Sequence, residues 1–414
     1  MNKTPAVRFI GFAEEWEQRK LGDVLSLLKD GTHGTHKDSD EGVFLLSAKN
    51  IKNGKVFIDE NTDRRISKQE FDSIHSNFRL HENDVLLTIV GSIGEVAMLE
   101  NPDIMTFQRS VAFLRPKDNL SSTFLKTELE TDYFQKELSD RKSQSAQPGV
   151  YLGELEKIPF ILPNVEEQNQ IGSYFRNLDN LITLHQRKYE KLKNIKKSML
   201  YKMFPQNGSK VPEIRFTGFT DDWEQRKLLE FGQATSGTSI ESEFSEYGIY
   251  KVISIGSYSE DNVYRDQGIR AVRSDKTVNK ILNKGDITMI LNDKTASGNI
   301  IGRVLLIEES GVYVYNQRTE RIEVDSSNYD SQFIYTMLNA PEIRDKIIKQ
   351  SQGNTQIYVN WTTVSQTDYL VPQLSEQRKI GKYFLNLDNL ITLHQRKLEK
   401  LKQLKQAMLH KMFV

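Results

Sequence analysis

Two histidines, His33 and His36, have the type and spacing that come closest to a metal site. They lie three residues apart in a run that also contains Gly31 and Gly34, and two glycines in so short a run predict a loop. A protein zinc site takes three or four ligands, but the sequence offers no cysteine and no third clustered histidine. We therefore expect no metal ligands in this chain.

Other catalytic motifs are missing from the sequence. It has no Gly-x-x-x-x-Gly-Lys-Ser/Thr loop for nucleotide phosphates, no Asn-Pro-Pro-Tyr-like amino-methyltransferase motif, and no Ser, His and Asp at a recognisable spacing. Gly91–Gly94 is too short for a dinucleotide fingerprint and predicts a tight turn between strands. The absence of cysteine excludes disulfides and thiol catalysis. Nothing in the sequence argues for an enzyme.

Length and charge leave the function open. The 414 residues suggest two or three domains, and 56 Lys and Arg balance 56 Asp and Glu. A neutral chain gives no compositional reason to expect nucleic acid as a partner. No apolar run is long enough for a membrane span or a signal peptide, so the expected location is the cytoplasm.

The sequence contains one unit twice. Trp16–Leu21 recurs unchanged as Trp223–Leu228, and Asn177–Lys188 recurs as Asn386–Lys397. Solenoid repeats have periods of about 20–50 residues. The residue numbers of the two copies differ by far more than that, which predicts a tandem duplication of domains.

Each copy has a divergent middle between these repeated segments. The variable parts, about 22–162 and 229–371, consist of short β-branched strands separated by Gly, Asn and Asp turns, with helical stretches after them. This pattern predicts an α+β fold class with two mixed α/β domains. The expected boundaries are 1–162 for the first domain, 163–205 for the first long helix, 206–371 for a linker and the second domain, and 372–414 for the second long helix.

The end of each copy predicts a helix of about 35 residues, which is too long for an ordinary globular helix. Asn164 and Glu167 resemble a capping box at the start of the first one. Residues of the predicted seam step by four and three, a spacing typical of a coiled coil, and duplication suggests a pseudo-two-fold axis and an antiparallel pair. The seam comprises Leu178, Ile182, His185, Tyr189, Leu192, Lys196, Met199 and Met203, and then Leu387, Ile391, His394, Leu398, Leu401, Lys405, Met408 and Met412.

Further leucines and isoleucines lie outside this seam. They form a second apolar face, which either packs on the chain's own domains or binds a partner: Leu181, Leu184, Ile195, Leu200, Leu390, Leu393, Leu404 and Leu409. Outward positions are basic, and such a run is more often a solvated face than a phosphate contact.

Several motifs occur in a characteristic order. They are Asp30–His33, Phe44–Ile51, Asn83–Thr88, Gly91–Gly94, Phe107–Ser110 and Glu167–Gln168, followed by the Lys-rich helix. With the duplication, this order covers nearly the whole chain and resembles the DNA-specificity subunit of type I restriction-modification systems. The second copy departs from the pattern, with Ala234–Thr238 in place of Lys29–His33 and Asn292–Gly298 in place of Gly91–Gly94.

The resemblance implies two target-recognition domains, each reading one half of an asymmetric, split site in double-stranded DNA. The helix pair would set the gap and carry two methyltransferase subunits and, through them, restriction or translocase subunits. This chain would hold no cofactor, because S-adenosylmethionine and ATP/Mg chemistry would belong to the partners. Three alternatives are a self-sufficient nuclease or methyltransferase, a stand-alone bipartite DNA-binding protein, and a coiled-coil scaffold.

Candidate DNA contacts are polar, basic and tyrosine residues in loops beside predicted strands. The first domain offers Lys29, Thr32, His33, Thr35, His36, Lys37, Lys49, Asn50, Gln108, Arg109, Gln147 and Tyr151, and the second offers Thr238, Ser239, Lys251, Asn292, Lys294, Gln317, Arg318, Asn354, Gln356 and Tyr358. Arginine and glutamine can bond purine edges with two hydrogen bonds. The two Gln-Arg pairs rank highest because they recur where most else diverged, although the arginines could instead brace the fold.

Overall fold

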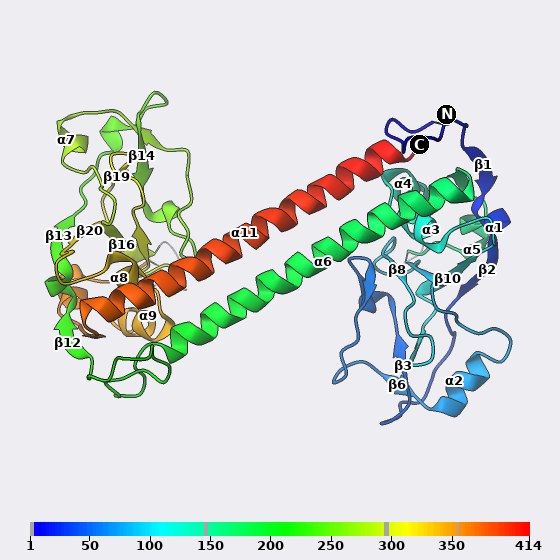
Figure 1. Ribbon diagram of the computed structural model, residues 1–414, viewed down its shortest axis with the longest axis horizontal. Coiled ribbons are helices and arrows are strands. Elements are labelled where there is room, and N and C mark those ends of the chain that lie inside the picture. Colours follow the sequence, from blue (N-terminus) through cyan, green and yellow to red (C-terminus); the bar gives the residue numbers. More distant parts are fainter. Residues whose placement is uncertain (1–3, 145–147, 294–297, 354–355) are drawn as a thin grey trace. The chain divides into compact units, whose positions relative to one another are not determined.

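The computed structural model describes residues 4–144, 148–293, 298–353 and 356–414. They fall into two compact units: the first comprises Met1–Arg187 and Gln395–Val414, and the second comprises Lys188–His394. Both units mix helices and short strands (Figure 1). The expected mixed α/β fold class is confirmed, and each long helix contributes one segment to each unit.

A four-stranded antiparallel sheet with the order β2-β10-β7-β8 is the centre of the first unit. A second sheet has the order β6-β3-β9, in which β3 and β9 are parallel, and two further pairs are β1-β11 and β4-β5. The strands are β1 Glu17–Lys20, β2 Leu25–Asp30, β3 Val43–Leu46, β4 Ile51–Lys52, β5 Lys55–Val56, β6 Arg65–Ile66, β7 Val85–Thr88, β8 Val96–Met98, β9 Met105–Phe107, β10 Val111–Pro116 and β11 Pro159–Leu162.

Short helices cover the sheets of the first unit. They are α1 Leu21–Val24, the 3-10 turn η1 Ala48–Asn50, α2 Lys68–Ile74, α3 Ser122–Leu129, α4 Asp132–Asp140 and α5 Leu152–Leu155. The helical stretch after β10 is divided into α3 and α4 where the Thr131 hydroxyl accepts a hydrogen bond from the Phe134 amide and caps α4.

The second unit repeats the topology of the two larger sheets and of the β1-β11 pair, but its remaining strand pair joins different segments. Its sheets have the orders β13-β20-β16-β18 and β15-β14-β19, with the pairs β12-β22 and β17-β21. The elements are β12 Glu224–Lys227, η2 Leu228–Phe231, β13 Gly232–Ser236, η3 Glu241–Glu243, β14 Tyr250–Ile253, η4 Ile255–Ser257, β15 Arg270–Ala271, α7 Asp275–Val278, β16 Ile287–Ile290, β17 Asn292–Asp293, β18 Val304–Leu306, β19 Tyr313–Tyr315, β20 Thr319–Val324, α8 Ser331–Leu338, α9 Pro341–Ile348, β21 Ile357–Tyr358, α10 Trp361–Ser365 and β22 Asp368–Val371.

The long helices are α6, Val165–Lys202, and α11, Leu374–Met412 (Figure 1). The Asn164 side chain accepts a hydrogen bond from the Glu167 amide at 3.0 Å, as the sequence predicts for the start of α6. Glu167 itself is fully buried and receives two hydrogen bonds from Arg8, at 2.6 and 2.8 Å. Glu376 and Arg215 repeat this contact at the start of α11, so the same buried ion pair anchors both helices.

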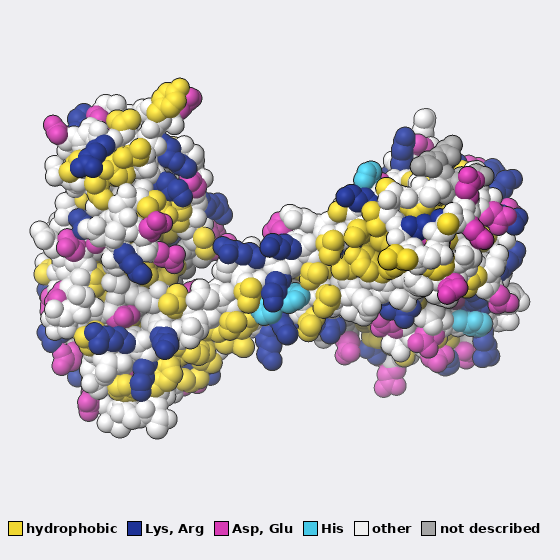
Figure 2. All heavy atoms as spheres, turned by 45° about the horizontal axis from the view of Figure 1, so that its top comes forward, with side chains coloured by type: hydrophobic (Ala, Val, Ile, Leu, Met, Phe, Trp, Pro, Cys, Tyr) yellow, Lys and Arg dark blue, Asp and Glu magenta, His cyan; other side chains and the backbone are white. Residues whose placement is uncertain are grey.

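Within each unit the two helix segments run antiparallel. In the first unit, Phe175 packs against Phe413 and Asp179 bonds Lys405. In the second, Phe204 packs against Phe384 and Lys196 bonds Asp388. The predicted seam residues are all buried or half-buried, whereas neighbouring Arg187, Lys188, Lys191 and Lys193 are exposed; Figure 2 shows basic side chains gathered along the helices.

The second apolar face of the helices divides into two sets. Ile195 and Leu200 pack against the core of the second unit, and Leu409 is buried in the core of the first. The remaining five leucines are 40–45% exposed: Leu181, Leu184, Leu390, Leu393 and Leu404. The chain's own domains therefore cover only part of this face.

Candidate nucleic-acid interface

The turn between β9 and β10 joins several loops of the first unit. Thr32, just after β2, forms a bridge with Gln108: its amide donates to the Phe107 carbonyl at 2.8 Å, and the Arg109 amide donates to the Thr32 carbonyl at 3.1 Å. A Cβ atom on Gly31 would lie 2.2 Å from the Phe107 carbonyl oxygen, so only glycine allows this close approach.

Three further segments meet the same turn. The Ile89 amide donates to the Ser110 carbonyl at 2.9 Å, the Ala48 amide donates to the Ser110 hydroxyl at 3.0 Å, and the Val150 amide donates to the Ile89 carbonyl at 2.9 Å. The loop after β2, η1, the loop after β7 and the segment before α5 therefore lie together at one edge of the central sheet. Most of the candidate contacts of the first unit belong to these segments.

The second unit builds the same edge around its β19–β20 turn. The Gly237 amide donates to the Thr319 carbonyl at 2.8 Å, and the Leu291 amide donates to the Arg318 carbonyl at 3.0 Å. The Val359 amide then donates to the Leu291 carbonyl at 2.9 Å, as Val150 does to Ile89. These three contacts correspond to Gly31–Val111, Ile89–Ser110 and Val150–Ile89 of the first unit, and they gather diverged loops at the same place in both units.

The strand register corrects the expected equivalence of the two Gln-Arg pairs. Phe107 pairs with Leu46 in β3 just as Tyr315 pairs with Ile253 in β14, so Phe107 corresponds to Tyr315. Counting on from there, Arg109 corresponds to Gln317, and Ser110 corresponds to Arg318. The identical dipeptides are offset by one residue and do not occupy equivalent sites.

Each turn nevertheless presents one exposed arginine. Within the described residues, the side chains of Arg109 and Arg318 make no hydrogen bond or ion pair. Arg318 has a φ of 66°, a left-handed backbone conformation that is costly for a side chain of this size. The neighbouring Gln317 side chain donates to Glu241 at 3.2 Å. The two units therefore hold a free guanidinium at different positions of the same turn.

Two side chains that hold this turn in place are not among the candidate DNA contacts. The Ser110 hydroxyl holds η1, and the buried Asn316 side chain accepts a hydrogen bond from the Ile240 amide at 3.1 Å. Ser110 ends the Phe107–Ser110 motif, but nothing in the sequence indicates the role of either side chain, because their partners lie far away along the chain.

Several candidates of the first unit have partners within it. His33 bonds Asp30 at 2.6 Å, whereas His36 bonds Glu70 at 2.7 Å and Thr32 at 2.9 Å, so the two histidines point to different partners. Across the residues that can be described, no group of three or more His, Asp or Glu side chains is arranged to hold a metal. The Lys29 ammonium lies 4.0 Å from the centre of the Phe78 ring.

Asn50 is placed in the interior of its loop. It is 5% exposed, and its amide donates to the Phe57 carbonyl at 3.0 Å and to Asp63 at 2.7 Å. The exposed Lys49 ammonium bonds the same Asp63 at 2.9 Å. This geometry gives Asn50 a role in holding the loop and leaves little of its side chain for a ligand.

The other candidates divide by exposure. Thr35, Lys37 and Tyr151 are exposed in the first unit, and Thr238, Ser239, Gln356 and Tyr358 are exposed in the second. Asn292 pairs with Tyr358 between β17 and β21. Lys251 lies 3.8 Å from Asp266, and hydrogen bonds from Arg270 and Gly268 lower the pKa of Asp266 to about 2. Gln147, Lys294 and Asn354 fall outside the described residues.

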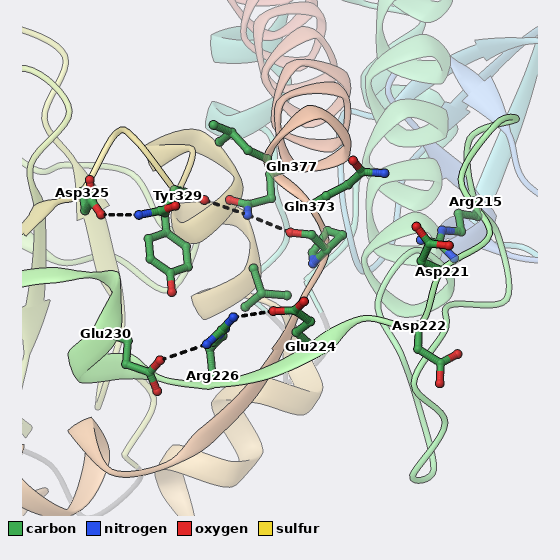
Figure 3. A pocket seen from close by; sticks show the side chains of 14 residues that line it. Arg215, Asp221, Asp222, Glu224, Arg226, Glu230, Asp325, Tyr329, Gln373 and Gln377 are labelled. Atoms are coloured by element: carbon green, nitrogen blue, oxygen red, sulfur yellow. Dashed lines mark hydrogen bonds and ion pairs between the residues drawn. The ribbon is translucent and has the colours of Figure 1, made fainter.

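A pocket of about 550 Å³ in the second unit has a different chemistry (Figure 3). It lies between β12, β22 and the start of α11, and its walls include five carboxylates and two arginines. Arg226 extends between Glu224 and Glu230, and Arg215 is engaged by Glu376. A mainly acidic wall repels phosphate, so this pocket is not the nucleic-acid surface.

Comparison with known proteins gives the family. The type I restriction modification DNA specificity domain matches twice, over residues 13–194 and 220–403. The chain belongs to this family. It is a type I restriction-modification specificity subunit with two recognition domains. Specificity subunits are the non-catalytic, DNA-recognising subunits of these systems. Membership of the family therefore implies DNA and other restriction-modification subunits as partners.

Named relatives cover almost the whole chain. The type I restriction enzyme MjaVIII specificity subunit of Methanocaldococcus jannaschii is 25% identical and aligns with 96% of this chain and 92% of its own. The putative MjaX specificity subunit of the same organism is 23% identical over the same shares. The crystal structure of the type I S subunit from M. genitalium has the same fold, with a TM-score of 0.66 and 16% identity over 99% of both chains.

The specificity subunit has no helix suited to crossing a membrane in the parts of the chain that the structure describes.

Proposed function

We propose that this specificity subunit reads an asymmetric, two-part DNA target, with each unit contacting one half. The observation that carries the proposal is the combination of a repeated scaffold with diverged edge loops. The helix-anchoring pairs Arg8–Glu167 and Arg215–Glu376 are alike, and so is the topology of the sheets. By contrast, the free arginine of the β9–β10 turn is offset by one residue from that of the β19–β20 turn. Two units that share a scaffold but differ in their loops are expected to recognise two different DNA half-sites.

The free energy needed for specific DNA binding favours two recognition units over one. A good two-bonded contact between an arginine and a guanine contributes about 1–3 kcal/mol of discrimination, whereas specific binding exceeds nonspecific binding by about 4–10 kcal/mol. One exposed arginine with its neighbours supplies only part of this difference. The net charge is zero, so partner subunits are expected to supply further phosphate contacts. The reading residues belong to segments 22–162 and 229–371.

The long helices are proposed to set the gap between half-sites and to bind two methyltransferase subunits, with restriction subunits joining through them. An unbroken helix of 38 residues extends about 57 Å and resists bending far better than a flexible linker. The exposed leucines of α6 and α11 supply an apolar surface for such a contact. S-adenosylmethionine, ATP and Mg are expected in the partners, and the cytoplasm, where DNA and partners are accessible, is the proposed location.

The test is co-expression of the chain with candidate methyltransferase subunits, followed by genome-wide mapping of methylated bases. We expect one motif made of two unlike blocks separated by a gap of fixed length. A palindromic motif, a single block, or no added methylation would contradict the proposal. Cells that express the methyltransferase subunits alone provide the control.

The role of the helices in spacing needs a separate experiment. Insertion of one helical turn into both α6 and α11 adds about 5.4 Å to each helix. We expect the methylated motif to keep both blocks and to have a longer gap. An unchanged gap in an assembled, active complex would reject this part of the proposal.

A further inference from the structure

The loop after the third strand of the central sheet differs in length between the units. In the first unit, Gly94 donates from its amide to the carbonyl of Thr88, the last residue of β7, at 3.0 Å. In the second, the Gly302 amide donates to the carbonyl of Ile290, the last residue of β16, at 2.9 Å. These glycines therefore correspond, and the numbering makes the second loop six residues longer (302 − 290 against 94 − 88). We call them the short loop, 89–94, and the long loop, 291–302.

Both loops begin at the candidate nucleic-acid interface, and the structure describes residues 291–293 and 298–302 of the long loop. The short loop begins at Ile89, which bonds Ser110, and the long loop begins at Leu291, which bonds Arg318. The long loop also includes Asn292, which pairs with the exposed Tyr358. The conformation of each loop therefore bears on the position of groups that would face DNA.

Arg344 of α9 holds the far end of the long loop. Its guanidinium donates to the Ile301 carbonyl at 2.7 Å and to the Asn299 carbonyl at 3.0 Å. Arg303 donates to the same Asn299 carbonyl at 2.7 Å. Gly302 is packed against α9 so closely that a Cβ there would lie 2.4 Å from Ile347. Residues 299–302 are thus fixed to α9 through their backbone, and Gly302 has no room to shift toward the helix.

The charged guanidinium of Arg344 is buried, which is unusual for an arginine bonded to backbone carbonyl groups. Arg344 is 6% exposed, and its hydrogen bonds go to carbonyl groups rather than to a carboxylate. Burial, together with the nearby Arg303, lowers the pKa of Arg344 to about 10. Desolvating a cation whose hydrogen bonds go to carbonyl groups is costly, so a neutral side chain would suit this site better if it served only to fill the core.

The first unit has a neutral side chain at the corresponding place. Gln135 is the fourth residue of α4, as Arg344 is the fourth residue of α9. Its amide donates to the Gly94 carbonyl at 2.9 Å and to the Leu129 carbonyl at 2.7 Å. One hydrogen bond thus holds the short loop, whereas two hydrogen bonds from the longer arginine hold the long loop.

We propose that Gln135 and Arg344 are positioning residues for base recognition, each fixing the C-terminal end of one loop from behind. This inference rests on the proposed function, because it assumes that the loops face DNA. Neither side chain touches DNA in this account. The longer loop has six more residues and therefore more conformations to restrict. This explains why an arginine with two hydrogen bonds takes the place of the glutamine there.

The test compares Arg344→Met, which removes the donors at similar length, with Arg344→Gln, which retains donors that can reach one carbonyl. Base preference in each half of the target is measured by methylation mapping with the complete complex. We expect Arg344→Met to relax preference in one half by about fivefold or more, and Arg344→Gln to restore part of it. Gln135→Met is the matched variant and should relax the other half instead.

Amide hydrogen exchange of the full chain separates positioning from folding. With Arg344→Met, faster exchange should be confined to the amides of Ile301, Gly302 and Arg303, with the core strands of the second unit unchanged. Exchange that rises throughout the unit would make Arg344 a folding residue and reject the proposal. So would undiminished preference in both halves or equal relaxation of both. The proposed function fails separately, if the wild-type complex shows no two-part target.

Discussion

Lys405 of α11 donates to the carboxylate of Asp179 of α6 at 2.7 Å, and Lys126 of α3 donates to the same group at 2.7 Å. Both lysines also reach Glu130, which completes a cluster of two cations and two anions in the first unit. Lys196 and Asp388 repeat the helix-to-helix pair in the second unit, where no second lysine among the described residues bonds the aspartate. Polar seam positions that match across a helix pair favour one register over its alternatives.

The cluster predicts that Asp179→Asn destabilises the chain more than Asp388→Asn, although both lie in the same repeated sequence. Removing the charge of Asp179 leaves buried Lys126 and half-buried Lys405 with one carboxylate, so the free energy of unfolding should fall by roughly 3 kcal/mol. Asp388→Asn breaks one half-exposed pair and should cost about 0.5–1 kcal/mol. Urea unfolding followed by hydrogen exchange in each unit measures both losses, with the exposed Asn180→Ala as control. Equal losses would contradict the prediction.

The same cluster predicts sensitivity to acid. Burial opposes the charge of Asp179, but Lys126 and Lys405 lower its pKa below the ordinary 3.8. Because the folded pKa is the lower one, the stabilisation is complete well above pH 3.8 and is lost as the pH falls through the folded value. Unfolding of wild type and Asp179→Asn should therefore converge in acid. A difference that persists unchanged to the lowest pH would refute this account.

A buried carboxyl in the first unit predicts the opposite pH dependence. Glu128 of α3 is 2% exposed, one of its oxygens has no partner among the described residues, and burial raises its pKa from 4.5 to about 8. Its stabilisation is present below pH 4.5 and is lost as the pH rises through about 8. The corresponding residue of α8 is Met337. Wild-type stability should therefore fall by a few kcal/mol between about pH 4.5 and 8, and Glu128→Met should remove this loss, as measured by thermal unfolding.

The reciprocal change checks the same idea. Met337→Glu should introduce a comparable alkaline loss of stability into the second unit. If neither substitution alters the pH dependence, Glu128 is not the group responsible.

Arg109→Ala and Arg318→Ala should each weaken recognition of a different half-site. A base contact with two hydrogen bonds would cost about 1–3 kcal/mol and relax the preference at one position, whereas a phosphate contact would weaken all sequences alike and reduce the salt dependence. Binding of the assembled complex to cognate and single-mismatch DNA distinguishes these outcomes. Arg19→Ala, on β1 and paired with Glu17, is the control. Unchanged affinity and preference would exclude the substituted arginine as a contact.

The exposed leucines predict where partner subunits bind. Leu181→Glu combined with the equivalent Leu390→Glu should reduce binding of methyltransferase subunits by at least about tenfold, because a charge would be buried in the contact. The chain alone should keep its stability, since both side chains are already exposed. Asn180→Glu with Asn389→Glu places the same charges one residue away and serves as the control. Wild-type assembly by the leucine variants would show that partners bind elsewhere.

Sequence periodicity was sufficient for the large elements but not for the site. The repeated segments and the four-and-three spacing indicated the mixed domains, the long helices and a seam that includes Lys196 and Lys405. Local pattern failed at the Gln-Arg pairs, because hydrogen-bond register between distant strands, not identity of letters, decides which residues correspond. Asn50 looked like a surface amide, yet its partners Phe57 and Asp63 place it inside a loop.

The last helical turns join residues from opposite ends of the sequence. Phe413 packs against Trp16 and Phe124, with ring centres 6.0 and 5.5 Å apart. Loss of that one ring would open a void beneath the N-terminal tryptophan at a cost of about 3–5 kcal/mol. During synthesis, the first domain consequently lacks a core side chain until the second domain and α11 have been made, so the part that is made first completes its core only after the part that is made later.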